Sequence, residues 1–251
     1  MATRQVRALT RGLDVLHALN RKSGRTARDL AESTGLPRPT VYRLLETLEA
    51  TGYVARDAGD DRYRVTNRVR ALADGFDDEA WVIETAIPLM RALCESIVWP
   101  VSLATIDGDA MLVRVTTDSQ SPLATTYFAT GDRLPIMGSA VGRAYLAFCG
   151  EPRSTAILEL ISKSDDPANR VARNPTQVAR ILGDTRRNGY AYREKGPFGT
   201  VSFAVPIMGK SGVAACLSMR YFDSAMTVAE GAERFVPTLR TTAESIATVV
   251  S

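Results

Sequence analysis

Apolar residues recur at helical spacing in three stretches of the first fifty positions, and glycines separate the stretches. In the first stretch the repeating positions are Val6, Leu9, Leu13, Leu16 and Leu19. Their spacing predicts an amphipathic helix. A second, shorter helix is expected after Thr26, because Asp29 stands three residues later and completes a capping-box pattern. Gly35 suits the left-handed backbone that often follows a helix end, so a tight turn is expected there.

The third stretch begins at Pro37 and ends before Gly52. Its apolar positions follow the i, i+3, i+4, i+7 pattern of a buried helix face, at Val41, Leu44, Leu45 and Leu48. Residues 53–56 and 62–65 then alternate between apolar and polar around a turn rich in Asp and Gly, which predicts a β-hairpin. Helix, helix, tight turn, helix and hairpin is the order of elements in a winged helix-turn-helix.

The rest of the chain alternates helical and strand patterns and predicts a second domain of the α+β class. Helices are expected at residues 67–76, 80–97, 138–149, 152–162, 174–188 and 227–250, the last opened by a Thr-x-x-Glu capping box. Strands are expected at residues 101–106, 110–116, 123–129, 201–207 and 213–221. We therefore expect a DNA-binding domain at 1–66, a linker helix at 67–80 and a further domain at 81–251.

Charge is distributed unevenly over a chain whose net charge is +3. Residues 1–68 carry 13 Lys and Arg against 8 Asp and Glu, a balance of +5, whereas the remainder carries 18 against 20, a balance of −2. A basic N-terminal domain on a slightly acidic body favours a polyanion as the partner of the first part. The alternative is that solvated charges cluster there by chance.

The predicted third helix fits the recognition of double-stranded DNA. A helix about 10–12 Å across enters the major groove, where arginine can bind guanine with two hydrogen bonds. Arginines elsewhere in the domain can hold phosphates. The candidate DNA-binding residues are Arg7, Arg11, Thr26, Arg38, Pro39, Thr40, Tyr42, Arg43, Arg62 and Arg64. The alternative is a three-helix module that docks another protein.

Residues suited to catalysis or metal binding are scarce. The single histidine is His17, and the three cysteines (Cys94, Cys149 and Cys216) stand far apart, which excludes a multi-histidine metal site and indicates reduced thiols. Residues 208–211 (MGKS) resemble the end of a phosphate loop, but Ala204 stands where that motif needs glycine. We predict no catalytic residue, no metal and no cofactor. The chain has no apolar run of ~18–20 residues and no signal segment, so we expect a cytoplasmic protein without membrane association.

Several segments resemble the IclR family of transcription regulators. In the N-terminal part they are residues 9–16 (LTRGLDVL), 30–37 (LAESTGLP), 40–48 (TVYRLLETL) and 52–54 (GYV). In the C-terminal part they are residues 131–135 (GDRLP), 140–147 (AVGRAYLA) and 201–207 (VSFAVPI). The resemblance runs through nearly the whole chain and implies a GAF/PAS-like effector domain in a homodimer or tetramer. It also implies that the linker helix joins the domains and helps dimerisation; the alternative is a plain connecting helix. Residues 79–81, 98–100 and 224–227 look most similar to members that activate 3-(3-hydroxyphenyl)propionate degradation.

The resemblance also implies where an effector binds. Residues 138–142 (GSAVG) open a predicted helix, whose free N–H groups favour an anion; the alternative is close packing of helix on sheet. Period-two spacing places Ser218 and Arg220 on one strand face, beside Ser202. Arg220 departs from the small polar residue usual in the family and pairs either with an effector carboxylate or with Asp or Glu. Arg193, near another family pocket position, is expected to be a solvated charge. The candidate effector-binding residues are Tyr127, Met137, Gly138, Ser139, Ala140, Ser202, Phe203, Ser218 and Arg220.

Taken together, these features predict a ligand-responsive regulator of an aromatic-acid catabolic operon. Its expected partners are operator DNA, an aromatic carboxylate, further copies of the chain and, for an activator, RNA polymerase. One alternative keeps the regulator and replaces the effector by a non-aromatic organic acid. Two others change the class: a DNA-binding protein with an enzymatic C-terminal domain, or a constitutive DNA-binding or scaffolding protein.

Overall fold

The structure is a computed structural model that describes residues 6–57, 59–72, 80–124, 128–196 and 199–250. The chain divides into two compact units, Met1–Asp77 and Asp78–Ser251. The candidate Tyr127 lies outside the described residues.

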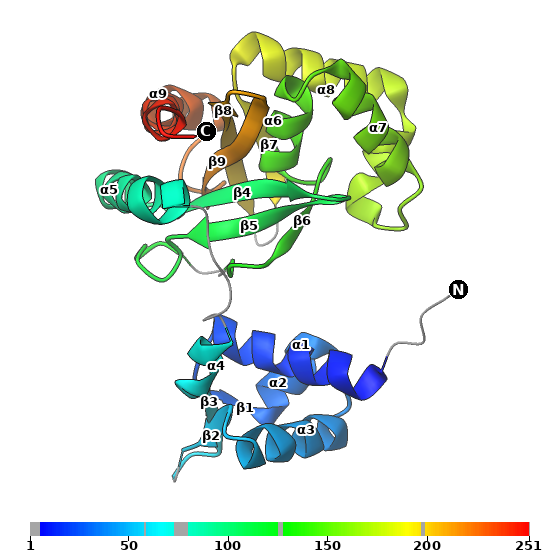
Figure 1. Ribbon diagram of the computed structural model, residues 1–251, viewed down its shortest axis with the longest axis vertical. Helices are drawn as coiled ribbons and strands as arrows, with labels where there is room; N and C mark the ends of the chain where they lie inside the picture. Colours follow the sequence, from blue (N-terminus) through cyan, green and yellow to red (C-terminus); the bar gives the residue numbers. More distant parts are fainter. Residues whose placement is uncertain (1–5, 58, 73–79, 125–127, 197–198, 251) are drawn as a thin grey trace. The chain divides into compact units, whose positions relative to one another are not determined.

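The N-terminal unit is a winged helix-turn-helix, as the sequence predicts (Figure 1). Its helices are α1 (Arg7–Arg21), α2 (Ala27–Thr34) and α3 (Arg38–Ala50), followed by the short α4 (Arg68–Ala71). Its strands are β1 (Arg25–Thr26), β2 (Val54–Arg56) and β3 (Arg62–Val65), in the order β1-β3-β2 with antiparallel pairing. The capping box at the start of α2 is present, and Gly35 adopts a φ of +68° at its end.

The core of this unit is built from the apolar faces of its three main helices. Val15, Leu19, Leu30, Val41 and Leu45 are completely buried. The apolar stripe expected on α1 is longer than the face that the unit buries, because Leu9 and Leu13 remain 63% and 46% exposed. Their exposure leaves an apolar surface along the first half of α1.

The C-terminal unit contains one antiparallel sheet of six strands in the order β6-β5-β4-β9-β8-β7. The strands are β4 (Val101–Asp107), β5 (Ala110–Thr116), β6 (Arg133–Pro135), β7 (Ala191–Gly196), β8 (Thr200–Gly209) and β9 (Gly212–Phe222). β8 and β9 form a long hairpin that closes with Gly209 paired to Gly212. Residues 208–211 are therefore a hairpin end and not a phosphate loop.

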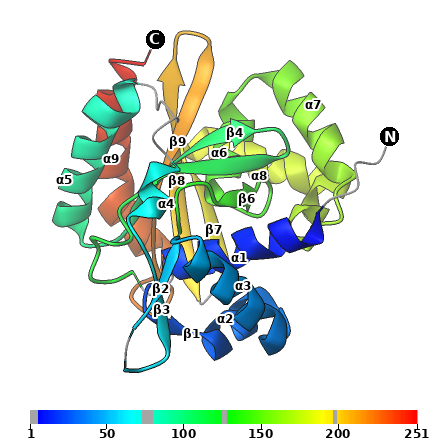
Figure 2. The ribbon, with the colours of Figure 1, turned by 60° about the horizontal axis from the view of Figure 1, so that its bottom comes forward.

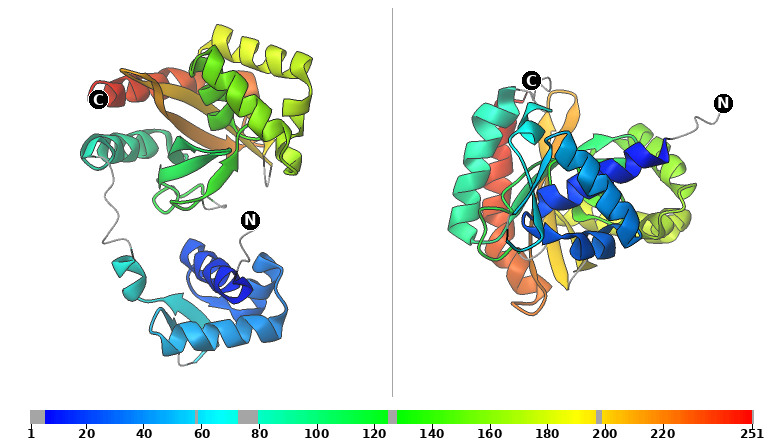
Figure 3. Two further views of the ribbon diagram at one scale, coloured as in Figure 1. Left: turned by 45° about the vertical axis from the view of Figure 1, so that its right-hand side comes forward. Right: turned by 90° about the horizontal axis from the view of Figure 1, so that it is seen from below.

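Helices cover both faces of this sheet (Figure 2, Figure 3). One face carries α5 (Ile87–Ile97), entered through a π-helical turn at Val82–Ala86, and α9 (Val228–Ala247). The other face carries α6 (Ala140–Phe148), α7 (Glu151–Ser162), a 3-10 helix at Pro167–Arg173 and α8 (Pro175–Asn188). Alternate residues of β9 belong to different cores. Leu217 packs in the core on the α5 and α9 side of the sheet, and Cys216 packs in the core on the α6 side. The expected period-two division of this strand is confirmed.

In the C-terminal unit, one expected strand is absent from the described residues, and the strands β6 and β7 were not expected. Residues 123–129 form no strand at their described positions, and the sheet continues instead through β6. A turn precedes this stretch, in which the N–H groups of Gln120 and Ser121 donate to the Thr117 carbonyl at 2.9 and 3.0 Å. The Ser121 hydroxyl donates to the Val98 carbonyl at 2.7 Å. β6 has only three residues, and β7 is mostly polar (AYREKG), so neither shows a clear apolar alternation.

Candidate DNA-binding surface and effector pocket

Helix α3 presents a polar, cationic face at its N-terminal end. Arg38, Pro39, Tyr42 and Arg43 are exposed and Thr40 is half-buried, while Val41 on the opposite face is completely buried. Within the described part of the chain, neither Arg38 nor Arg43 forms an ion pair. Their guanidinium groups are therefore available for bases or phosphates.

The wing arginines are exposed but already paired. Arg62 Nε lies 2.9 Å from Asp60, and Arg64 Nε lies 2.6 Å from Asp57. Exposed ion pairs of this kind contribute about 0–1 kcal/mol, so a phosphate can replace the carboxylate at small cost. Arg7 and Arg11, on α1, are also exposed.

Thr26 differs from the other DNA-binding candidates because its hydroxyl has a structural task. The Thr26 hydroxyl accepts a hydrogen bond from the Asp29 N–H at 3.2 Å, and the Asp29 carboxylate accepts one from the Thr26 N–H at 3.0 Å. The hydrogen bond from the Thr26 N–H and the closeness of the Thr26 hydroxyl lower the pKa of the Asp29 carboxyl group. The two hydrogen bonds fix the first turn of α2, the first helix of the helix-turn-helix.

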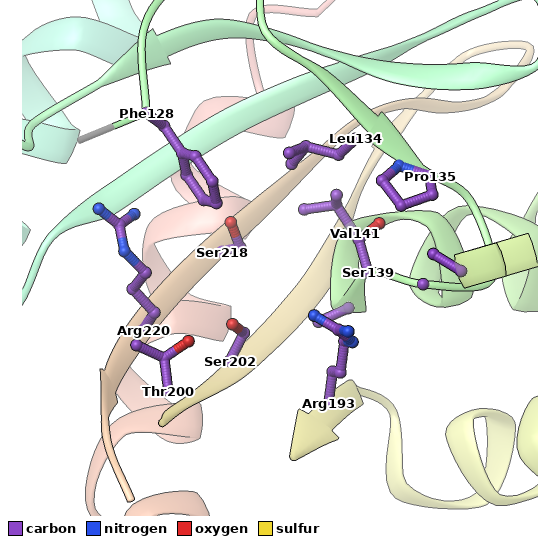
Figure 4. A pocket seen from close by; sticks show the side chains of 13 residues that line it. Phe128, Leu134, Pro135, Ser139, Val141, Arg193, Thr200, Ser202, Ser218 and Arg220 are labelled. Carbon is purple, nitrogen blue, oxygen red and sulfur yellow. The ribbon is translucent and has the colours of Figure 1, made fainter. Parts of the chain in front are cut away.

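A cavity of about 210 Å³ lies in the C-terminal unit, bounded by the sheet and the start of α6 (Figure 4). Of the predicted effector-binding residues, it is lined by Gly138, Ser139, Ala140, Ser202, Ser218 and Arg220. Val141, from the 138–142 segment that the sequence also singled out, lines the cavity too. Four residues that were not effector-binding candidates complete this part of the lining, namely Leu134, Pro135, Ala168 and Thr200. The Phe128 side chain is also part of the lining.

The structure does not bring Met137 and Phe203 to the cavity. Both are completely buried, Phe203 in the core beside α5 and α9 and Met137 in the core around α6. For Phe203 the reason is strand geometry, since neighbouring residues of a strand point to opposite faces and Ser202 faces the cavity. Met137 is held inward by its N–H, which donates to the Asn169 side chain at 3.1 Å.

Arg220 forms a buried ion pair with Asp118, so the structure contains the salt bridge that was one of the two expected alternatives. The Asp118 carboxylate also accepts hydrogen bonds from the Thr116 hydroxyl at 2.5 Å and the Phe128 N–H at 2.6 Å. The Arg220 guanidinium lies 4.4 Å from the centre of the Phe128 ring. The ion pair thereby ties one wall of the cavity to β9. The sequence gives no signal for Asp118, which stands 102 residues before its partner.

Arg193 lines the cavity and is half-buried, which corrects the expectation of a solvated charge. Removal from water lowers the pKa of its guanidinium. Strand register explains the position, because Arg193 pairs with Ser202 on β8 and Ser202 pairs with Arg220 on β9. The polar character of β7 concealed this register in the sequence.

The glycines around α6 allow close packing. A Cβ atom on Gly138 would lie 2.6 Å from the Cβ of Ala168, and one on Gly142 would lie 2.1 Å from the Ile136 carbonyl oxygen. The Ser139 hydroxyl accepts a hydrogen bond from the Gly142 N–H at 3.1 Å and so caps the helix. The start of α6 is therefore closely packed against its neighbours and also borders the cavity.

Two family models match this chain, the IclR helix-turn-helix domain at residues 8–58 and the bacterial transcriptional regulator IclR C-terminal domain at residues 78–248. The chain belongs to the IclR family. The Pca regulon regulatory protein of Pseudomonas putida is 27% identical over 237 residues, 92% of this chain and 80% of that protein. The transcriptional repressor IclR of Escherichia coli K12 is 26% identical over 196 residues, 77% of this chain and 71% of that protein.

Solved structures of IclR proteins share the fold. An IclR family regulator from Brucella abortus has a TM-score of 0.60 and 26% identity, covering 100% of this chain and 95% of that one. An IclR homologue from Microbacterium hydrocarbonoxydans, solved with 4-hydroxybenzoate, has a TM-score of 0.60 and 23% identity, covering 96% and 98%. Identities near 25% support the family and not the closer similarity to hydroxyphenylpropionate activators.

This IclR-family chain is a transcriptional regulator with a DNA-binding and an effector-binding part. Over the described residues, His, Cys, Asp and Glu side chains form no cluster of three or more that could hold a metal ion. None of the described helices has the length and apolar character needed to span a membrane.

Proposed function

We propose that this regulator controls a catabolic operon for a monocyclic aromatic acid of the phenylpropionate or benzoate type. The cavity carries this proposal, because its apolar wall of Phe128, Leu134 and Val141 faces a polar side that contains arginine and serine. An apolar protein cavity of about 150 Å³ binds benzene. A cavity of about 210 Å³ therefore has room for one ring and a short acidic chain. The 4-hydroxybenzoate in the Microbacterium homologue is a ligand of this kind.

In the proposed DNA complex, α3 lies in the major groove. Arg38, Pro39, Thr40, Tyr42 and Arg43 face the base edges, since they occupy the N-terminal turns of the recognition helix. Thr26 lies at the start of α2, the helix that crosses the DNA backbone. Arg7, Arg11, Arg62 and Arg64 hold phosphates and set the position of the domain without reading sequence.

We propose that the protein binds a pseudo-palindromic operator in the cytoplasm as a homodimer or a tetramer. Leu9, Leu13 and the 61% exposed Leu72 line an open apolar surface cavity of the N-terminal unit together with Leu16, Leu44 and Leu48. Contiguous exposed apolar surface of this kind marks an interaction site, here for a second copy of the same chain. Two recognition helices would then reach half-sites about 34 Å apart. An activator of this type would also contact RNA polymerase.

The effector acts through its different affinity for DNA-bound and free conformations of the regulator. Fluorescence anisotropy of the full-length protein on its own upstream DNA, at constant salt, tests this proposal with benzoate, 4-hydroxybenzoate and 3-phenylpropionate. At least one acid is expected to change the DNA Kd by about 5- to 150-fold. A probe with a single half-site should bind more weakly.

Pyruvate and succinate serve as controls. If only these two acids change the DNA Kd, the effector is a non-aromatic acid and the aromatic-acid proposal is refuted. An upstream-DNA affinity no greater than that for random DNA would refute the regulator's role at that operon.

A further inference from the structure

Three polar side chains form a row across the cavity floor. Arg193 on β7, Ser202 on β8 and Arg220 on β9 are directly paired neighbours in the antiparallel sheet. Paired residues point to the same face, and neighbouring strands lie about 4.7–4.9 Å apart. The two arginines therefore stand at opposite sides of Ser202, about 10 Å apart in their backbones. Figure 4 shows them on either side of the serine.

The two arginines differ in how their charge is balanced. Arg220 is neutralised by Asp118, and both side chains are almost completely buried. Within the described ranges, no carboxylate lies within ion-pair distance of Arg193, and its side chain forms no hydrogen bond. Glu194, the next residue of β7, points to the opposite face because strand side chains alternate. The Ser202 hydroxyl is likewise without a side-chain hydrogen bond in this part of the chain.

A second arginine adds to the positive potential beside Arg193. Arg143 on α6 donates to two backbone carbonyls, that of Met137 at 3.0 Å and that of Tyr192 at 2.8 Å. Burial and, to a smaller extent, the charge of Arg193 lower the pKa of Arg143. The N-terminus of α6, with Ser139 as its cap, opens on the same cavity and contributes further positive potential. An anion bound here would relieve the repulsion between the arginines.

We propose that Arg193, together with the Ser202 hydroxyl, binds the acidic group of the effector. The ring then lies toward Phe128, Leu134 and Val141, and Arg220 acts as a positioning residue that holds Asp118 and the Phe128 wall in place. The inference rests on the proposed function, since it assigns the orientation of an aromatic acid in the same cavity. It makes Arg193 the residue that selects acids over neutral analogues.

Isothermal titration calorimetry of the full-length protein tests the assignment. Each acid (benzoate, 4-hydroxybenzoate and 3-phenylpropionate) is compared with its neutral primary amide, on the wild type and on Arg193→Met. The wild type should bind at least one acid more tightly than its amide. Arg193→Met should weaken the binding of that acid by about 10- to 100-fold, as expected for the loss of a charge-assisted hydrogen bond. Binding of the amide should change by less than about threefold, because no ion pair is lost.

Two matched variants complete the design. Arg193→Lys retains the charge and should recover part of the acid affinity, which a merely structural role of Arg193 would not produce. Arg180→Met makes the same replacement at an exposed site on α8 outside the cavity lining, and it should bind as the wild type does.

The possible failures are distinguishable. If the wild type binds an acid and Arg193→Met binds it equally well, the role of Arg193 is refuted while the aromatic-acid proposal stands. If the wild type binds the amides as tightly as the acids, the charge-selecting role is refuted. If the wild type binds none of the three acids, the aromatic-acid proposal falls and the assignment of Arg193 falls with it.

Discussion

At the scale of single residues, the two arginines of the cavity show that burial alone does not define a ligand contact. Both lie on the same face of the sheet, and both line the cavity. Arg220 is paired with Asp118, whereas Arg193 faces the cavity with no such pair over the described chain. A buried ion pair with further hydrogen bonds is expensive to break, because removing one partner leaves the other charge buried.

We expect Arg220→Met to reduce the free energy of unfolding by about 3–5 kcal/mol, because it leaves the Asp118 carboxylate buried without its cation. Urea unfolding followed by circular dichroism measures this loss. Arg180→Met, at an exposed site, should change the free energy by less than about 0.5 kcal/mol. Adding Asp118→Asn to Arg220→Met should recover part of the loss. Equal unfolding midpoints for Arg220→Met and Arg180→Met would contradict the structural role of the pair.

At the scale of elements, capping residues near the helix ends determine where helices begin, whereas long-range packing determines where the short strands form. The last helix, α9, shows the first case. The Thr227 hydroxyl accepts from the Glu230 N–H at 3.3 Å, while the Glu230 carboxylate accepts from the Thr227 N–H at 2.8 Å and from its hydroxyl at 2.7 Å. The helix then buries Phe235, Leu239 and Ile246 against the sheet.

Thr227→Ala should destabilise the protein by about 0.5–2 kcal/mol at pH 7, because the helix loses its N-cap. The effect should depend on pH, since the hydrogen bonds from Thr227 lower the pKa of Glu230. A lowered pKa means that the ionised carboxylate stabilises the fold above the unfolded pKa of about 4.3, and that this contribution disappears as the pH falls through the folded value.

The difference between wild type and Thr227→Ala in thermal unfolding should therefore narrow in acid. Thr238→Ala, at an exposed position in the same helix, is the control and should show no such pH-dependent difference. A difference that stays constant from pH 7 to pH 3 would argue against the ionised capping box.

At the scale of the whole molecule, charge is distributed between the two units in agreement with their functions, because the DNA-binding unit is basic and the effector-binding unit is not. The +5 balance of residues 1–68 gives the DNA-binding unit a general attraction for phosphates, while the slightly acidic remainder has none. In the proposed DNA complex, base readout and phosphate binding are carried by different side chains of that unit. They should therefore respond differently to substitution.

Affinity for operator DNA should fall steeply with salt, by about 10³- to 10⁵-fold between 50 and 200 mM if the protein makes roughly 6–10 phosphate contacts. Arg11→Ala should weaken operator and random DNA alike and reduce the salt slope by about one. Arg43→Ala should instead cost about 1–3 kcal/mol on the operator and lower the ratio of specific to random binding. Fluorescence anisotropy with both DNAs measures these quantities. A flat salt response, or an unchanged ratio for Arg43→Ala, would contradict the assignment.

The sequence by itself determined the features that depend on near neighbours in the chain. Helical spacing, the capping boxes at Thr26 and Thr227 and the glycine at position 35 identify the winged helix-turn-helix, the starts of α2 and α9 and the end of α2, since each signal spans only a few residues. Period-two alternation likewise placed Ser218 and Arg220 on the cavity face of β9.

The tertiary structure alone decided which distant residues meet. Asp118 and Arg220, 102 positions apart, pair because Ser102 on β4 is the register partner of both Thr116 on β5 and Ser218 on β9. The register of the polar strand β7 brings Arg193 beside Ser202, and the close packing of Gly138 against Ala168 brings the 3-10 helix to the cavity lining. Registers and packings of this kind arise from the summed burial of the whole unit, so no short stretch of sequence encodes them.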